Sequence, residues 1–438
     1  MFQRLKKMHT VRVPHRKHTA EDAPTFLPTP DKVTIPMSMH IGAPARPTVK
    51  VGDTVKVGDV IAEPSAFVSS YVHASVSGTV TKIGTVMLSN GTFGNAVTIE
   101  SDGKREISDA VSPPKVNSYE DFIEAVKKSG AVGLGGAGFP TVVKLSPKDL
   151  SLLDTVIVNA AECEPYITSD TRTMLDSSED ILEGVRLLRR YLGAKNVVLA
   201  IEENKPAAIK KMRDTLGGEA TVKVLPSRYP QGAEKLVIYH SVGRVIPEGK
   251  LPIDVGVIVI NCTTLAFLAS YIRTGLPLVR KTVTVDGGAV KEPKNLVVPI
   301  GTPLSYVFDA CGGFTEEPDR ILYGGPMMGI TVPSLDTPVL KNTNALLALT
   351  KAEAASEEPS PCLRCGACVS ACPMGLTPPA FAEAFRKNDC EALGKLKIHL
   401  CMECGCCSFV CPAHRKIVQK NRLAKRAYTA YLKERKGQ

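Results

Sequence analysis

The sequence lacks the features that direct a chain into or across a membrane. Its first 18 residues contain no apolar core, so no secretory signal peptide is expected. The longest uncharged apolar run, residues 255–272, is interrupted by Asn261, Thr263, Thr264 and Ser270, which favours a buried strand and helix over a transmembrane span. Hydrophobic residues make up 44% of the 438 residues and charged residues 22%, which excludes a mostly disordered chain. We therefore expect a soluble, cytoplasmic protein of several domains.

Acidic residues are absent or rare at both ends of the chain. Residues 1–18 contain six Lys or Arg and no acid, and residues 412–438 contain nine Lys or Arg and one acid, Glu434. Since the formal net charge is +10, the body between these ends is slightly acidic. A basic body that binds nucleic acid is therefore not expected.

Residues 413–438 have the pattern of a basic amphipathic helix. An apolar face would lie opposite a basic one, with Ile417, Ala424, Tyr428 and Tyr431 against Arg415, Arg422, Arg426 and Lys433. Such a helix suits a membrane surface or a protein partner, and a solvated face is the alternative. Residues 1–18 are the weaker candidate for the same docking role.

Cysteine, by contrast, is abundant and clustered. Ten of the 13 cysteines fall in residues 362–411, which points to metal rather than disulfides in a large cytosolic protein. The run C-x2-C-x2-C-x3-C-P occurs twice and is the bacterial ferredoxin spacing for [4Fe–4S] clusters, in which the fourth cysteine serves the other cluster. The expected ligand sets are Cys362, Cys365, Cys368 and Cys411 for one cluster, and Cys401, Cys404, Cys407 and Cys372 for the other.

Two questions about this cysteine region concern its metal and its register. Zinc bound by four thiolates is a poor alternative, because both copies of the run are complete and each is followed by proline. Cys406 stands beside Cys407, so an exchange of these two in the ligand set stays open. Apolar periodicity between the two runs predicts helices, as in the helical type of two-cluster ferredoxin.

Residues 49–83 contain a short repeat typical of β-structure. Two Val-x-Val-Gly-Asp units read as strands with Gly-Asp turns, and residues 74–83 continue the alternation. This stretch resembles the barrel-sandwich fold of biotinyl and lipoyl carrier domains. No lysine lies between Lys56 and Lys82, which argues for the fold and against a swinging-arm function.

The middle of the chain is expected to be α/β. Ser118 and Asp121 give a capping-box-like helix start, residues 156–158 and 197–201 read as buried strands, and residues 181–192 read as a helix. Residues 282–332 return to β-structure. Residues 334–361 read as a linker with an acidic end.

Residues 133–138 contain a literal G-x-G-x-x-G. A Rossmann fingerprint needs a strand before it and a helix after it, whereas here a predicted helix precedes and Pro140 follows almost at once. A glycine-rich loop whose backbone N–H groups approach a phosphate remains a good interpretation.

Residues 133–144 resemble the flavin-binding loop of the NADH-binding subunit of respiratory complex I, with its pattern G-R-G-G-A-G-F-P-T-x-x-K. Three further segments resemble motifs of that family in the same order: residues 159–165 (N-A-A-E-C-E-P), 229–234 (Y-P-Q-G-A-E) and 261–265 (N-C-T-T-L). Leu134, Ala161 and Ala233 depart from the family pattern. With the barrel-sandwich start and the two cysteine runs, the whole chain resembles the C-subunit family of the Rnf ion-translocating ferredoxin:NAD oxidoreductases.

This resemblance implies a multidomain α/β plus β fold. The implied parts are an N-terminal extension and barrel-sandwich (lipoyl-like) domain in residues 1–116, a Rossmann-like α/β domain for FMN and NADH in 117–281, a β-grasp (SLBB-like) domain in 282–333, a linker in 334–361, an α-helical two-cluster ferredoxin domain in 362–412 and the basic tail in 413–438.

The resemblance also implies which residues meet the cofactors. Those on the FMN phosphate side are Gly133, Gly135, Gly136 and Lys144. Those lining the flavin and ribityl chain are Asn159, Glu162, Tyr229, Gly232, Asn261 and Thr264. Those on the NAD(H) side are Phe139, Glu164 and Glu234, and Gly138 and Thr263 complete the set. No side chain is expected to act as a catalytic nucleophile or base.

The function implied is electron transfer between NAD(H), non-covalently bound FMN, two [4Fe–4S] clusters and partner subunits. The implied partners are the iron–sulfur B subunit and the membrane subunits of the same complex, with this chain peripheral on the cytoplasmic face of the cell membrane. The alternative is a diaphorase-type subunit of a soluble hydrogenase or formate dehydrogenase. A third hypothesis is a non-catalytic assembly or nucleic-acid protein with structural zinc.

Overall fold

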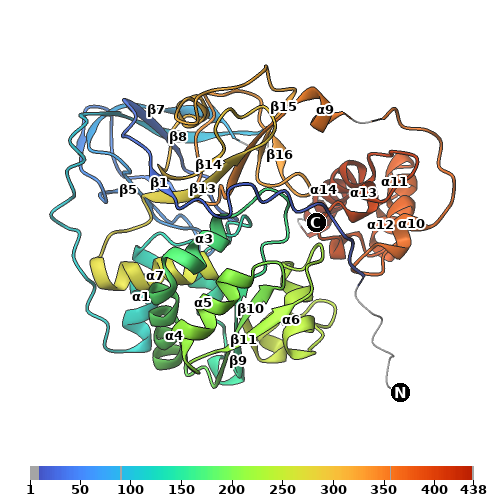
Figure 1. The fold of residues 1–438 in the computed structure, drawn as a ribbon, viewed down its shortest axis with the longest axis horizontal. Helices are drawn as coiled ribbons and strands as arrows, with labels where there is room; N and C mark the ends of the chain where they lie inside the picture. Colours follow the sequence, from blue (N-terminus) through green and yellow to red (C-terminus); the bar gives the residue numbers. More distant parts are fainter. Residues whose placement is uncertain (1–8, 89–90, 356, 437–438) are drawn as a thin grey trace.

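A computed structural model describes residues 9–88, 91–355 and 357–436 of the chain (Figure 1). In Figure 1 two β-rich units lie above an α/β unit, and a group of C-terminal helices lies at the right. The strands of the described residues form four sheets. None of the described helices is long and apolar enough to span a membrane.

Residues 32–101 form two small antiparallel sheets, which confirms the expected barrel-sandwich. The strand orders are β2-β8-β7-β4 and β3-β5-β6. Their bounds are β2 Lys32–Pro36, β3 Arg46–Pro47, β4 Thr54–Val55, β5 Val60–Glu63, β6 Val72–His73, β7 Gly78–Met87 and β8 Phe93–Ser101. In both predicted Gly-Asp turns, the carboxylates of Asp53 and Asp59 accept a hydrogen bond from the amide three residues earlier, at 2.9 and 2.7 Å.

The next unit is built on a parallel four-stranded sheet of order β11-β10-β9-β12. Its strands are β9 Thr155–Ala160, β10 Asn196–Glu202, β11 Thr221–Leu225 and β12 Val257–Asn261. Its helices are α1 Tyr119–Lys128, α2 Thr141–Leu145, α3 Ser169–Asp176, α4 Ser178–Leu192, α5 Pro206–Leu216, α6 Glu234–Val242 and α7 Cys262–Thr274, with short 3-10 turns η1 Leu150–Leu152 and η2 Pro252–Val255. The predicted strands and helices are formed, and Ser118 and Asp121 make the predicted capping box of α1.

The strand order of this sheet identifies where a ligand can bind. From β9 the chain proceeds to β10 on one side, whereas β12 lies on the other side of β9. In open α/β sheets, ligands bind at the carboxyl ends of the strands where the order reverses in this way. The candidate position is therefore the edge shared by the ends of β9 and β12.

A mixed six-stranded sheet of order β1-β14-β13-β17-β15-β16 forms the third unit. Its elements are β1 Thr25–Phe26, β13 Arg280–Asp286, β14 Lys294–Pro299, α8 Leu304–Asp309, β15 Arg320–Tyr323, β16 Ile330–Thr331 and β17 Ala345–Leu349. Residues 334–361 are therefore not a linker throughout, because β17 lies between β13 and β15 and all its residues are buried. The apolar run from Ala345 to Leu349 fits a strand buried on both faces, and the short helix α9 Lys351–Ala354 follows it.

The C-terminal residues form a compact helical group. It contains α10 Ala367–Ser370, α11 Pro378–Arg386, α12 Cys390–Lys395, η3 Ile398–Leu400, α13 Cys406–Phe409 and α14 Ile417–Lys436. The predicted basic helix is α14, but its apolar face is not free for docking. Ile417, Val418 and Ala424 are buried, and Tyr428 packs against the core of this same group.

Residues 9–22, which we call the N-terminal arm, run along the body of the protein. In Figure 1 the arm crosses from the helical group toward β1. Val11 pairs with Tyr229 through two backbone hydrogen bonds of 2.8 and 2.9 Å, and the Lys17 side chain enters the loop that follows β9. The described part of the predicted basic N-terminal segment thus packs on its own chain, while residues 1–8 lie outside the described residues.

Candidate functional site

The carboxyl ends of β9 and β12 bring three of the predicted cofactor segments together. Asn159 and Asn261 are neighbours in the register of the two strands. Asn159 Nδ2 donates to the Gly232 carbonyl at 2.9 Å. A Cβ at Gly232 would lie only 2.5 Å from the Ala161 carbonyl oxygen, so this close approach requires glycine. Residues 159–161, 229–234 and 261–265 therefore share one edge of the sheet.

The glycine loop, residues 133–138, closes over the same edge. The Leu134 amide donates to Thr264 Oγ1 at 2.9 Å, and Asn342 Nδ2 donates to the Gly136 carbonyl at 2.9 Å. At the base of the loop, the Gly133 amide donates to the carbonyl of the half-buried Phe139 at 2.8 Å. Gly136 has a φ of 113°, a conformation that favours glycine.

The glycine loop has the features of an anion site. The N–H groups of Gly135, Gly136 and Ala137 donate to no other residue in the part of the chain that the structure describes. Successive N–H groups that point outward from such a turn form an anion-binding concavity. A Cβ at Gly135 would lie 2.9 Å from Asn261 Nδ2, so glycine allows the loop to approach the strand end. These residues fit a group that carries a phosphate.

Two charged residues that the sequence analysis did not single out support this edge. Buried Asp170 accepts hydrogen bonds from Asn261 Nδ2 at 2.8 Å and from Thr263 Oγ1 at 2.6 Å. Lys281 of β13 donates to the Leu134 carbonyl at 2.8 Å, and burial lowers the pKa of Lys281 to about 8. No local pattern marks either one, because Asp170 reads as an ordinary first-turn helix residue and Lys281 as the start of a strand in another sheet.

Lys144 and Glu234 lie at the more open rim of the site. Lys144 Nζ and Glu234 Oε1 form an ion pair of 2.8 Å, with about a third of each side chain exposed, 31% and 40%. The family resemblance implies that Lys144 lies near the phosphate and Glu234 near NAD(H). Since the two are paired, an incoming phosphate would compete with Glu234 for Lys144.

Glu162 lies behind the site rather than at its open side. Its carboxylate accepts hydrogen bonds from the Asp170 amide and from Thr171 Oγ1, both at 2.7 Å. Burial raises the pKa of Glu162. The side chain thus braces the start of α3, whose Asp170 in turn holds Asn261.

Glu164 and Tyr229 join the site to the other units of the protein. Glu164 accepts hydrogen bonds from the amides of Met327 and Met328 at 3.0 and 2.9 Å, and burial raises the pKa of Glu164 to about 7. The Tyr229 hydroxyl donates to the Cys404 carbonyl at 2.7 Å and lies 3.4 Å from Glu164 Oε1. These two residues therefore face the cysteine region and the six-stranded sheet.

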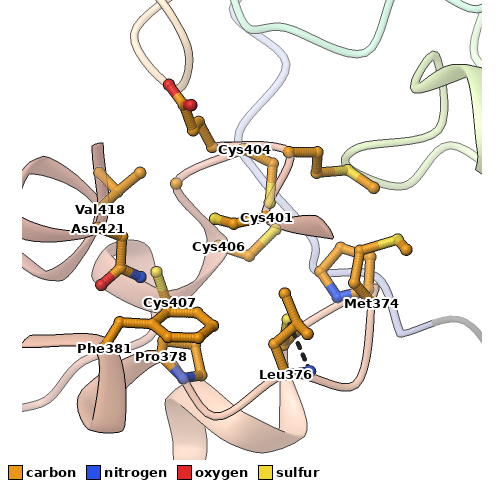
Figure 2. Close-up of a pocket in the computed structure, with 15 residues that line it drawn as sticks. Met374, Leu376, Pro378, Phe381, Cys401, Cys404, Cys406, Cys407, Val418 and Asn421 are labelled. Atoms are coloured by element: carbon orange, nitrogen blue, oxygen red, sulfur yellow. Dashed lines mark hydrogen bonds between the residues drawn. The ribbon is translucent and has the colours of Figure 1, made fainter. Parts of the chain in front are cut away.

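The second predicted ligand set converges on one pocket of the helical group (Figure 2). Cys372, Cys401, Cys404 and Cys407 line it, as does Cys406, with Phe381, Val418 and Asn421 among the other lining residues. Mutual electrostatic repulsion among these thiols contributes to raising the pKa of Cys407, after burial, to about 12. Within the described residues, no three His, Cys, Asp or Glu side chains are grouped tightly enough to hold a single metal ion.

The backbone repeats between the two cysteine runs and distinguishes Cys406 from Cys407. Three positions with positive φ recur at the same place in each run: Arg364 and Glu403, Gly366 and Gly405, and Gly375 and His414. The short helices α10 and α13 also begin at equivalent positions, Ala367 and Cys406. Cys407 is therefore the counterpart of the predicted ligand Cys368, and Cys406 is the counterpart of Ala367.

The first predicted ligand set is closer to the surface. Cys362 and Cys365 are exposed, whereas Cys368 and Cys411 are partly buried beside Cys407. Burial raises the pKa of the Cys368 thiol, and the nearby thiols of Cys411 and Cys362 add to the shift. The structure thus brings Cys362, Cys368 and Cys411 near one another, with Cys365 on the exposed loop between them.

Models of three protein families match successive parts of the chain. They are the RnfC Barrel sandwich hybrid domain over residues 7–104, the Nuo51 FMN-binding domain over residues 126–270 and the SLBB domain over residues 282–331.

Curated relatives match most of the chain. The C subunit of the proton-translocating ferredoxin:NAD(+) oxidoreductase complex of Clostridium ljungdahlii is 43% identical over 83% of this chain and 80% of the relative. The C subunit of the Na(+)-translocating complex of Acetobacterium woodii is 42% identical, covering 86% of each chain, and that of the ion-translocating oxidoreductase complex of Rhodobacter capsulatus is 40% identical over 87% of this chain and 75% of the relative. The air-oxidized crystal structure of an NAD+-reducing [NiFe]-hydrogenase has a TM-score of 0.49 at 18% identity, covering 71% of this chain and 63% of that chain.

Proposed function

The chain belongs to the family of C subunits of ion-translocating ferredoxin:NAD(+) oxidoreductase complexes, and on this basis we propose that it exchanges electrons between NAD(H) and the rest of such a complex. The proposed carriers are one non-covalently bound FMN and two [4Fe–4S] clusters. FMN, when bound, supplies the conversion between the two-electron chemistry of a nicotinamide and the one-electron chemistry of the clusters. The residues of the chain bind and orient these groups, and none is needed as a nucleophile or general base.

The observation that carries this proposal is the contact between the candidate flavin edge and the cysteine pocket. Tyr229 belongs to the segment that supplies Gly232 to the edge, and its hydroxyl donates to the Cys404 carbonyl at 2.7 Å. Val11, Tyr229, Cys404 and Cys406 also share one buried apolar cluster. A flavin at this edge and a cluster in this pocket would therefore be neighbours.

We assign FMN to the edge where β9 and β12 end. The free N–H groups of the glycine loop and Lys144 would meet its phosphate. The other residues proposed to contact the flavin and ribityl chain are Asn159, Tyr229, Gly232, Asn261, Thr263 and Thr264. The buried position of Glu162 supports a bracing role rather than direct contact.

NAD(H) is proposed to approach from the open rim. Phe139 and Glu234 remain candidates there, since Phe139 is half-buried and Glu234 lies partly exposed beside Lys144. Glu164 is a weaker candidate, because its carboxylate is engaged by the amides of Met327 and Met328.

The two clusters are assigned different positions along the electron path. The cluster held by Cys372, Cys401, Cys404 and Cys407 would lie next to the flavin, because Cys404 contacts Tyr229. The cluster held by Cys362, Cys365, Cys368 and Cys411 would lie beyond it, where exposed cysteines suit electron exchange with a protein partner.

The domain boundaries are proposed as residues 1–116, 117–281, 282–333 and 362–412, with two extensions that the secondary structure supports. Residues 345–349 supply β17 to the six-stranded sheet, so we extend the proposed β-grasp unit to include them. The tail of residues 413–438 supplies α14, so we add it to the proposed ferredoxin unit. The proposed partners are the iron–sulfur B subunit and the membrane subunits of the complex, with this chain peripheral on the cytoplasmic face.

Anaerobic purification followed by cofactor analysis tests the function. We expect about eight irons with matching acid-labile sulfide and about one FMN per chain, and NADH should produce reduced-cluster signals in electron paramagnetic resonance. Zinc in place of iron, together with an absence of flavin, would contradict the proposal and favour a structural protein.

A further inference from the structure

Lys17 of the N-terminal arm occupies an unusual position inside the 161–167 loop, the segment that follows β9. Its ammonium donates to three backbone carbonyls of this loop: Glu162 at 2.9 Å, Glu164 at 2.8 Å and Ile167 at 2.5 Å. Three donors are the full complement of a lysine ammonium. One side chain from a distant part of the sequence thus gathers three carbonyls of a single loop.

The ammonium is held in this place although burial is costly for a charge. Its side chain is 15% exposed, and the nearest carboxylate oxygen, Glu162 Oε2, is 3.9 Å away. Lys205 Nζ approaches the same Glu162 carbonyl at 3.4 Å and pairs with Glu202 at 2.9 Å. The partly buried Lys17 and the buried Lys205 therefore both approach the Glu162 carbonyl, and the buried carboxylates of Glu162 and Glu202 lie close enough to offset their charge.

The 161–167 loop connects Lys17 to the candidate flavin edge by direct contacts. Glu162 accepts from the Asp170 amide, and the Asp170 carboxylate accepts from Asn261 Nδ2 and Thr263 Oγ1. At the start of the loop, the Ala161 amide donates to Asn159 Oδ1 at 3.1 Å. A change in the path of this loop would therefore move the groups that line the edge.

We propose that Lys17 is a positioning residue that holds the 161–167 loop in the shape that binds FMN. This inference rests on the function proposed above. Because Lys17 acts on backbone carbonyls, neither the complex I-like motifs nor the glycine loop reveals it. The neighbouring Arg16 supports the same placement of the arm, since it donates to Tyr166 at 2.5 Å and to Glu353 at 3.0 Å.

The test compares the full-length protein with its Lys17→Met variant, which keeps a long side chain but removes all three donors. Lys210→Met is the matched control, because Lys210 is an exposed lysine of the same unit whose ion pair, among the residues that the structure describes, is with Asp214 on its own helix. Two quantities are measured: hydrogen–deuterium exchange of peptides covering residues 161–167 in flavin-free protein, and the dissociation constant for added FMN.

We expect exchange in the 161–167 loop to become at least tenfold faster in Lys17→Met and FMN to bind at least tenfold more weakly, with Lys210→Met unchanged in both. Added excess FMN should restore NADH oxidation by Lys17→Met. Unchanged loop exchange would overturn the inference, and faster exchange with wild-type FMN affinity would overturn the role of Lys17 in cofactor binding.

Two further comparisons keep the test decisive. If exchange rises throughout the Lys17→Met protein, the second variant is Lys17→Gln, which keeps two N–H donors. Its exchange in the 161–167 loop should lie between those of wild type and Lys17→Met. Wild-type loop exchange in this folded variant would overturn the inference. If the wild-type protein binds no FMN at all, the proposed function fails, whereas loop exchange still reports whether Lys17 orders the loop.

Discussion

At the scale of single residues, the structure helps to distinguish the predicted cluster ligand Cys407 from its neighbour Cys406. Both are buried, both line the pocket in Figure 2, and their adjacency left the register open from sequence. The repeated positive-φ positions favour Cys407 as the ligand, because Gly405 corresponds to Gly366 and Cys407 to Cys368. The repeat in backbone conformation thus agrees with the spacing, which also favours Cys407 over its neighbour.

Substituting each of these cysteines tests the register. Cys407→Ala should lose one of the two clusters, about half of the iron, because no other thiol stands at the ligand position of the loop. Cys406→Ala should keep the full iron and sulfide content, since Ala already occupies the equivalent position 367 of the first run. Iron and sulfide assays with electron paramagnetic resonance measure both. Iron loss in Cys406→Ala but not in Cys407→Ala would reverse the assignment.

Glu164 provides a pH-dependent prediction at the same scale. Burial raises the pKa of its carboxyl from an ordinary 4.5 to about 7. Between these two values the folded protein holds a proton that the unfolded chain has lost, so the contribution of Glu164 to stability falls as pH rises through this window. Glu164→Gln has no such titration.

We therefore expect wild-type protein to lose stability relative to Glu164→Gln between pH 5 and pH 8, by up to about 3 kcal/mol. Urea unfolding followed by tyrosine fluorescence at matched pH values measures the difference. The Michaelis constant for NADH should change less than twofold, because Glu164 is engaged by the Met327 and Met328 amides. A stability difference that is constant with pH would contradict this description of Glu164.

At the scale of elements, the sequence predicted those whose signals are local. The capping box at Ser118, the strand cores in β9 and β10 and the Gly-Asp turns at Asp53 and Asp59 all form as expected. In each case the deciding interaction lies within a few residues, or within one continuous apolar run. Propensity and periodicity are sufficient there.

Two elements show where local signals fail. The sequence predicts a linker over residues 334–361, because acidic residues and prolines stand at its end. β17 nevertheless forms within it, since its place in the sheet depends on pairing with β13 and β15. The amphipathic pattern of α14 was correctly identified as a helix, but the pattern does not say what covers the apolar face. The cover is the helical group itself, through Ala424 and Ile417.

The residues of the candidate site also fall into two groups, those that local sequence patterns predict and those that they do not. Its glycine loop and its cysteine runs were predicted, because spacing alone defines them. Asp170, Lys281 and Lys17 were not, because each acts on the site across more than 80 residues of sequence, through side-chain contacts that tertiary structure creates.

At the scale of the whole molecule, the structure shows which of the residues behind the formal net charge of +10 make internal contacts and which are exposed. Part of the basic N-terminal segment is used internally, since the partly buried Lys17 binds the 161–167 loop and Arg16 pairs with Glu353. Within the described residues, a concentration of exposed positive charge lies on the outer side of α14, at Lys420, Arg426 and Lys433. We therefore expect any docking by this helix to use its exposed charge rather than the covered residues of its apolar face.

This distinction makes deletion of the tail an unsuitable test of docking. Val418 and Asn421 of α14 line the pocket that contains Cys407, and Ala424 belongs to the core of the helical group. Removing residues 415–438 would expose that pocket to water and take away part of its wall. Loss of membrane association after such a deletion would follow from damage to this cysteine pocket as readily as from lost docking.

Charge reversal on the exposed side of α14 separates the two effects. The variant Lys420→Glu, Arg426→Glu, Lys433→Glu should keep wild-type iron and FMN contents, because none of the three side chains is buried. It should bind partner-containing membranes at least tenfold more weakly at low salt, since each basic residue near an anionic surface contributes about 1 kcal/mol. The matched control reverses Lys210, Lys211 and Arg213, three exposed cations on α5 with the same total charge change. Co-sedimentation at several salt concentrations measures binding, and equal loss in both variants, or none in the first, would exclude α14 as the docking surface.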